Sequence, residues 1–239
     1  MDTKYAYLVG SLFFLAVWIV IFALKKETRK EMTIISFFFL PVVPILEYLH
    51  IKDYWIPGFI WGNFFGVEDF IFAFSFAGIA SVIYQVVFKK RKETLKKYLV
   101  IPKVRKNWPA YLIFFGGMVF MIFSFFYFML GVNSVIALIF AFLFAGLYMI
   151  MQRRDLLVNA IFSGLLMSLL FFLFYFVLFL RLYPDIIERW WQISDLSGNM
   201  IYGLPIEEVA WAFAFGFMFG PLYEFVCHLT LKKVDQNDI

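Results

Sequence analysis

Two pairs of adjacent carboxyl groups open strongly apolar stretches of the sequence. Glu207 and Glu208 follow Pro205 in GLPIEEVAWAF, and Glu68 and Asp69 precede FIFAF. Two neighbouring carboxyl groups in a dry site do not both ionise easily, because charge repulsion and the loss of hydration oppose the second charge. Such a pair can therefore supply one proton donor and one proton acceptor. All four acids are candidate catalytic residues for acid–base chemistry.

The residues around the two pairs also correspond. Aligned on the pairs, both stretches carry an aromatic residue four positions after the first acid, Phe72 and Trp211, and a tyrosine sixteen positions after it. Residues four apart lie on nearly the same helix face. An aromatic face beside an acid suits a developing carbocation, so we assign Phe72 and Trp211 to substrate binding. A Gly-Asn pair precedes each acid pair, and we assign Asn63 and Asn199 to the same site.

A structural role for these acids is also open. A carboxylate in the first turn of a helix is stabilised by the helix dipole, and proline is an ordinary residue at a helix start. Repetition at equivalent positions favours function, because acids near a membrane are costly unless they serve a site or a partner. Glu47, in PVVPILEYLH, is expected at the same level. It is either a further catalytic acid or an interfacial residue that reaches water, and we favour catalysis.

The composition is that of an integral membrane protein. Of 239 residues, 64% are hydrophobic and only 16% are charged, and the mean hydropathy is +0.85. A soluble domain is usually about a quarter charged. His50 and His228 are the only histidines, which excludes a histidine-rich metal site, and we expect no metal and no cofactor. The net charge of +4 does not indicate nucleic-acid binding, because the basic residues lie in short loops between apolar spans.

Hydropathy predicts seven transmembrane helices, since each span needs about 20 mostly apolar residues. The predicted spans are Tyr5–Leu24, Met32–Leu49, Val67–Phe88, Ala110–Leu130, Val132–Met151, Leu156–Leu182 and Ile206–Leu231. Seventeen of the 21 Lys and Arg residues fall in alternate loops on one side, nine of them between Lys89 and Lys106. By the positive-inside rule that side is cytoplasmic. We therefore expect a multi-pass protein of the cell membrane, in contact with lipid, with its N-terminus outside and both acid pairs at the outer face.

The repeated acid pairs predict a tandem repeat of three helices. Because three is odd, two such units run in the same direction only if one further helix joins them. The fold class we predict is therefore all-α, with parallel repeats in a 3+1+3 arrangement. Residues 1–90 form the first repeat, 91–131 the basic loop and linker helix, and 132–239 the second repeat. Repeats of this kind place a shared site between the halves. The oligomeric state is not predicted.

The motif LPIEEVAWAF, with PLYEF further on, resembles the repeated signature of membrane-integral, flavin-independent lycopene cyclases. Each domain in that family has three helices with a P-x-E-E motif opening the third, and fused forms carry a joining helix. Pro205, Glu207 and Glu208 match the motif. In the first half, Gly66 stands in place of the proline and Asp69 in place of the second glutamate.

The resemblance implies an intramolecular lyase or isomerase that acts on a carotenoid. A proton adds to the terminal double bond of a linear ψ-end, an internal double bond attacks the cation, and a proton leaves to give an ionone ring. Two alternatives remain open: a small-solute transporter with parallel 3+1+3 repeats, and a noncatalytic scaffold of the same fold. The transporter would need polar residues along several helix centres, whereas the centres here are nearly all apolar, which favours an apolar isoprenoid substrate.

Overall fold

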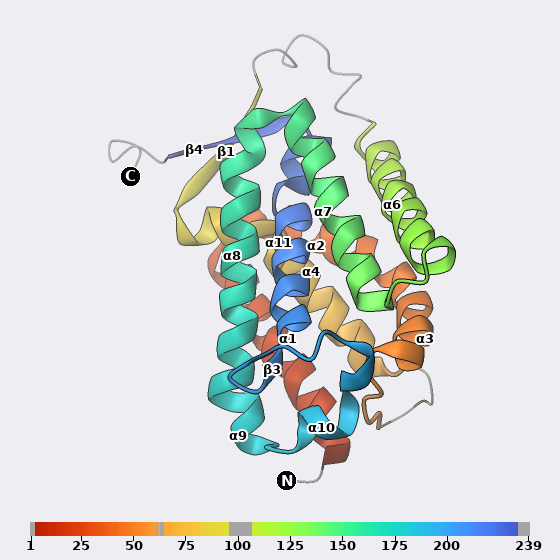
Figure 1. The fold of residues 1–239 in the computed structure, drawn as a ribbon. Coiled ribbons are helices and arrows are strands. Elements are labelled where there is room, and N and C mark those ends of the chain that lie inside the picture. The colour runs from red at the N-terminus through yellow and green to blue at the C-terminus, as the bar shows by residue number, and fades with distance from the viewer. Residues whose placement is uncertain (1–2, 61, 63–64, 96–106, 234–239) are drawn as a thin grey trace.

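The computed structural model describes residues 3–60, 62, 65–95 and 107–233, and most of them lie in long helices (Figure 1). In this part of the chain, seven helices are long and apolar enough to cross a membrane, as hydropathy predicted. They cover Thr3–Leu24, Lys26–Asp53, Val67–Val87, Trp108–Met129, Ser134–Gln152, Arg154–Leu182 and Ile206–Val226.

Several of these spans contain more than one regular element. The first span contains α1 (Ala6–Leu24), and the second contains α2 (Arg29–Phe39) and α3 (Val43–Asp53). The third is α4 (Val67–Val87). The fourth and fifth are α6 (Trp108–Ser124) with a π-helical turn at Phe125–Met129, and α7 (Ser134–Gln152). The last two are α8 (Leu157–Leu173), a π-helical turn at Phe174–Phe179 and α9 (Leu180–Leu182), and α11 (Ile206–Val226). The short helix α10 (Ile186–Trp190) and the hairpin of β2 (Met200–Ile201) and β3 (Leu204–Pro205) precede α11.

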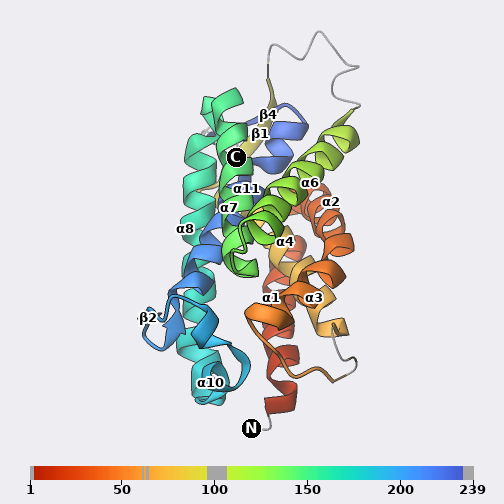
Figure 2. The same cartoon turned by 45° about the vertical axis from the view of Figure 1, so that its right-hand side comes forward.

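Helices α4 and α11 form the centre of the bundle. They are the two most buried of the seven spans. Helix α11 packs against α8, α7 and α4, and α4 packs against α1, α2 and α8. Helix α6 lies on the outside (Figure 2). The acid pairs stand at the ends of α4 and α11 that face α10 and the N-terminus of the chain.

Small residues allow α11 to approach α8 closely. Gly216 and Gly220 are four residues apart and face the same neighbour. A Cβ atom at Gly216 would come within 2.5 Å of the Ser163 carbonyl oxygen, and one at Gly220 would overlap the Ser163 side chain. Such pairs of small residues are a common basis of helix packing in membranes, because they let the two backbones meet.

The last predicted helix was too long. Helix α11 ends at Val226, and the next residues form the strand β4 (Leu229–Lys233) instead of continuing to Leu231 as a helix. This strand pairs antiparallel with β1 (Lys90–Thr94), which lies in the loop predicted only as a basic connection. Lys89 and His228 adopt left-handed backbone conformations, with φ of 49° and 54°, and separate each helix from its strand. Residues 96–106 of the loop lie outside the described residues.

The second span differs from its prediction in another way. It extends from Arg29 to Asp53, beyond both ends of the predicted range, and a 3-10 turn at Leu40–Val42 interrupts it. Pro41 and Pro44 cause the interruption, because proline has no amide hydrogen for the helical ladder.

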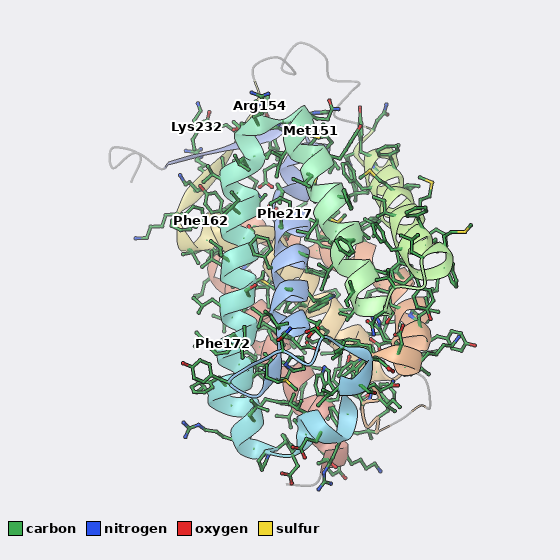
Figure 3. All side chains as sticks on the ribbon, in the orientation of Figure 1. Met151, Arg154, Phe162, Phe172, Phe217 and Lys232 are labelled. Atoms are coloured by element: carbon green, nitrogen blue, oxygen red, sulfur yellow. The ribbon has the colours of Figure 1, made fainter. Side chains whose placement is uncertain are left out.

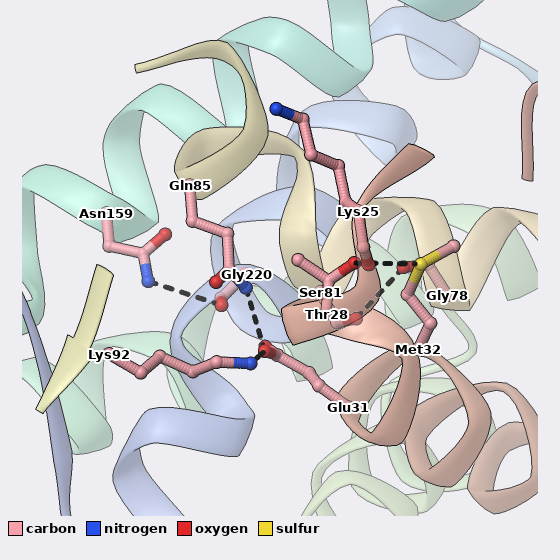
Figure 4. A network of polar contacts seen from close by, with 10 residues as sticks. All are labelled: Lys25, Thr28, Glu31, Met32, Gly78, Ser81, Gln85, Lys92, Asn159 and Gly220. Carbon is pink, nitrogen blue, oxygen red and sulfur yellow. Dashed lines mark hydrogen bonds and ion pairs between the residues drawn. The ribbon is translucent and has the colours of Figure 1, made fainter. Parts of the chain in front are cut away.

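A polar network joins the ends of α2 and α4 that are remote from the acid pairs (Figure 4). The buried Glu31 carboxylate accepts a hydrogen bond from Gln85 at 2.7 Å and forms an ion pair with Lys92 of β1, also at 2.7 Å. Glu224 is fully buried at the same end of α11, and its carboxyl oxygens have no hydrogen-bond partner among the described residues.

The outside of the bundle is covered by apolar side chains (Figure 3). Phe162 of α8 is 40% exposed and Met151 of α7 is 79% exposed. Arg154 and Lys232 lie at the end that carries β1 and β4. Charged ends and an apolar girdle are what a bundle surrounded by hydrocarbon requires.

The close approach at Gly220 gives the first prediction. Gly220→Ala should lower the free energy of unfolding by about 1–3 kcal/mol, the usual cost of overpacking. The matched control is Gly117→Ala in α6, where an added Cβ meets no atom within 4 Å. That change should be neutral or stabilise by up to about 1 kcal/mol, from helix propensity alone. Unfolding in detergent provides the measurement, and equal stability of the two variants would contradict the packing argument.

Candidate active site

A cavity lies between the two halves of the chain at the N-terminal ends of α4 and α11. Its free volume is about 90 Å³. Three carboxyl side chains line it: Glu47 from α3, Asp69 from α4 and Glu208 from α11. The rest of the lining is almost entirely aromatic or aliphatic. The structure thus brings acids from both halves into one largely apolar space.

Within each acid pair, only the second residue faces the cavity. The first residue of each pair instead accepts a hydrogen bond from the preceding loop. Glu68 Oε1 accepts from the Ile60 amide at 2.9 Å, and Glu207 Oε1 accepts from the Ser197 amide at 2.8 Å. Adjacent helical residues point about 100° apart. The first acid of each pair therefore contacts the loop, and the second faces the cavity. The catalytic assignment of Glu68 and Glu207 stays a prediction.

Asp69 is held by two hydrogen-bond donors. The Tyr7 hydroxyl donates to Oδ1 at 2.5 Å, and the Gly66 amide donates to Oδ2 at 2.7 Å. The first bond joins α1 to α4. The second satisfies an amide at the start of the helix, where donors have no partner within the helix itself.

Glu208 is also held by two donors. The Trp191 indole donates to Oε1 at 2.5 Å, and the Tyr54 hydroxyl donates to the same oxygen. Burial, and then the neighbouring Glu208 carboxyl, raise the pKa of Tyr54 well above its ordinary value. The phenol therefore keeps its proton and remains a donor. Tyr54 follows α3 and Trp191 follows α10, so this acid connects the two halves.

Glu47 differs from the other two cavity acids. Its carboxyl group accepts a hydrogen bond from Trp55, but the Oε2 atom is buried and has no hydrogen-bond partner among the described residues. It lies close enough to Asp69 for the two carboxyl groups to repel each other when both are ionised. A buried carboxyl oxygen without a donor is better suited to hold a proton than a charge.

Aromatic rings fill the space next to these acids. Phe72 and Trp211 both line the cavity, as the sequence indicated, and their ring centroids are 6.1 Å apart in a stacked arrangement. Phe76 stacks on Trp211 at 5.0 Å. The negative faces of such rings stabilise a nearby cation.

The structure describes one of the two asparagines assigned to the site. Asn63 lies outside the described residues. Asn199 is exposed, and its side-chain amide contacts the Ser197 hydroxyl at 3.2 Å. Its backbone carbonyl accepts a hydrogen bond from Ile206 at 3.0 Å, so its observed contribution is to the loop before α11.

Two short segments border the cavity, one following α3 and one following α10. Trp55 and Trp191 form an antiparallel bridge, in which the Ile56 amide donates to Trp190 O at 2.7 Å and the Gln192 amide donates to Tyr54 O at 2.8 Å. The three tryptophans also line the cavity. Asp69 and Glu208 are only 1% and 2% exposed beside these segments, and water exclusion strengthens electrostatic interactions inside.

Sequence reasoning missed the side chains that hold the acids. Tyr7, Tyr54 and Trp191 are common residue types in this chain, and no spacing marks them. His50, which also lines the cavity, had one signal: it is one of two histidines in 239 residues. Among the described residues, no three His, Cys, Asp or Glu side chains are grouped so that they could hold a metal ion.

Comparison with known families agrees with the motif around Glu207 and Glu208. Residues 133–226 match the family described as lycopene cyclase. This region is similar to the domains of that family. It includes α7, α8 and α11, and therefore Glu208 and Trp211 of the cavity. No curated protein and no solved structure matches the chain.

The loop contact of Glu207 gives the second prediction. Glu207→Leu should speed hydrogen exchange of the Ser197 amide several-fold, up to about tenfold, because an intramolecular hydrogen bond contributes roughly 0.5–1.5 kcal/mol. Glu207→Gln keeps an oxygen acceptor and should change exchange little. Exchange followed by mass spectrometry of peptides covering residues 193–201 measures this. Unchanged exchange in Glu207→Leu would show that the contact does not hold the loop.

Proposed function

We propose that the protein is a carotenoid end-group cyclase that closes a lycopene-type linear end into a ring by carboxyl acid–base chemistry, with no net redox change. The similarity of residues 133–226 to the lycopene cyclase family supports the reaction class. The observation that carries the proposal is the cavity, in which Glu47, Asp69 and Glu208 stand among aromatic rings. An apolar polyene needs such surroundings, and the reaction needs an acid within them.

The three cavity acids have different roles, which follow from their different hydrogen-bond partners. Glu47 is suited to deliver the proton that adds to the terminal double bond. Burial opposes a negative charge on Asp69 and Glu208, and the two hydrogen bonds that each receives offset part of that cost, so that each can carry the charge in the reaction. Their negative charges, with the faces of Phe72 and Trp211, stabilise the cation formed on ring closure.

We also propose that the halves are parallel repeats. Helices α1 and α7 each have 19 residues, and a three-residue 3-10 turn follows each after one residue. Helices α4 and α11 each have 21 residues, and a five-residue strand follows each. When Glu68 is aligned with Glu207, Lys92 corresponds to Leu231, and these two residues pair in the β1–β4 ladder. Such pairing of equivalent residues is what a local two-fold axis produces. The repeats then comprise residues 3–94 and 134–233, with α6 as the linker.

The proposed orientation gives the third prediction. With the basic end in the cytoplasm, a membrane-impermeant maleimide added to intact cells should label Asp195→Cys and not Lys232→Cys. Both positions are exposed. Burial raises the pKa of the native Cys227 thiol to about 11, which slows its reaction, and a Cys227→Ser background removes it altogether. Labelling after membrane disruption checks that both cysteines can react. Outside labelling of position 232 instead of 195 would reverse the orientation.

The cavity acid of the matched domain gives the fourth prediction. Glu208→Gln keeps the size of the side chain and an oxygen acceptor but removes the charge. It should lower turnover by about 10²-fold or more, the usual effect of losing a positioned acid–base or electrostatic group. The assay is pigment analysis of a lycopene-producing host, or of purified protein with a linear carotenoid.

The control is Glu188→Gln, on an exposed acid of α10 at the same end of the bundle, which should retain full activity. Ring formation by Glu208→Gln at the wild-type rate would remove Glu208 from the mechanism. A wild type that forms no ring from any linear carotenoid would contradict the cyclase function and favour a transporter or a scaffold.

A further inference from the structure

A chain of three polar residues leads from the cavity to the outer surface. His50 lines the cavity, and its Nδ1 atom lies 2.7 Å from Ser134 Oγ. The Ser134 hydroxyl donates to Asp53 Oδ1 at 2.5 Å, and the Ser134 amide donates to Asp53 Oδ2 at 2.9 Å. His50 and Asp53 belong to α3, and Ser134 is the first residue of α7. The chain therefore joins the two halves beside the site.

The donors along this chain fix the tautomer of His50. A serine hydroxyl has one proton, and here Ser134 gives it to Asp53. Ser134 Oγ can then only accept from His50, so Nδ1 must carry a hydrogen. In the neutral imidazole this leaves Nε2 with a free lone pair, and no described residue donates a hydrogen bond to it.

We propose that His50 Nε2 is the base that accepts the proton leaving the cyclic cation, with Ser134 and Asp53 as positioning residues. This inference rests on the proposed cyclase function. The imidazole lines the same cavity as Glu47 and Glu208 and packs against the Tyr54 ring, with centroids 5.2 Å apart. A third group that fixes the orientation of a base is a recurrent arrangement in catalysis.

The proposed steps balance in atoms and charge. The carboxyl proton adds to the terminal double bond, and the internal double bond closes the ring to give a cyclic tertiary cation. A C–H bond next to the cationic carbon then breaks, its electron pair forms the ring double bond, and the proton moves to Nε2. Transfer of that proton back to the carboxylate restores both groups. Asp53 stabilises the transient imidazolium through Ser134.

The base also determines which ring forms. The cyclic cation can lose a proton from any of the carbons next to the charged centre, and each loss gives a different ring isomer. A fixed base selects one of them by position. A residue that only holds α3 against α7 would have no such effect on the product.

The first test reads the tautomer directly, without any activity. His228→Asn leaves His50 as the sole histidine, and asparagine tolerates the left-handed backbone at position 228. The ¹⁵N spectrum of this variant, labelled on histidine and purified in detergent, should show a protonated Nδ1 and a bare Nε2 at neutral pH. Adding Ser134→Ala should shift the ring toward the Nε2–H form. A His50 that is already Nε2–H, or doubly protonated, would overturn the proposal.

The second test compares matched asparagine variants for turnover and ring isomer on a linear carotenoid. The amide nitrogen of His50→Asn replaces Nδ1 as donor to Ser134, so the contact between the halves is kept while the base is lost. Turnover should fall about 10²-fold or more, and the product should become a mixture of ring isomers. Ser134→Ala should show a smaller loss, and His228→Asn should match the wild type.

The outcomes separate the two proposals. Wild-type turnover and a single ring isomer from His50→Asn would overturn the role of His50 and leave the cyclase function standing. A fall in turnover with the wild-type isomer unchanged would assign His50 a structural role and also overturn the proposal. A wild type that forms no ring would overturn the cyclase function and, with it, the base.

Discussion

Carboxyl groups at the N-terminal ends of α4 and α11 are buried in a mostly apolar bundle, and each needs hydrogen-bond donors that water would otherwise supply. Glu68 and Glu207 obtain them from the amides of the preceding loops. Asp69 and Glu208 obtain them from side chains of other elements. The hydrogen bonds to these acids therefore fix the positions of the two preceding loops, of α1, and of the segments that follow α3 and α10. The cavity is what remains between the groups so positioned.

Much of the fold follows from hydropathy, because a span of about 20 apolar residues has few alternatives. The predicted and observed starts of α4 and α11 coincide at Val67 and Ile206. The predicted end of α11 was wrong, because Leu229 and Leu231 are as apolar as the residues of the helix before them. Whether such residues form a strand depends on β1, which is far away in the sequence. No local pattern contains that information.

The candidate site was less accessible to sequence reasoning. The acids could be found because carboxyl groups are rare in apolar stretches, and Glu47, Asp69 and Glu208 do line one cavity. Which member of each pair faces the cavity depends on the rotation of α4 and α11 about their axes, which packing decides. Tyr54 and Trp191 could not be distinguished among the 13 tyrosines and seven tryptophans of the chain. The link from His50 to Asp53 through Ser134 requires α3 and α7 to be adjacent, and that is a tertiary property.

The pairing of β1 with β4 holds the two halves together without using the segment that connects them along the chain. Strand β1 closely follows α4 and strand β4 closely follows α11, and the two strands pair with each other. At the other end, the bridge between Trp55 and Trp191 also joins the halves without any part of α6. Neither contact uses a hydrogen bond from α6. In the proposed repeat arrangement, the covalent connection through α6 sets the stoichiometry of the two halves and raises the local concentration of one around the other.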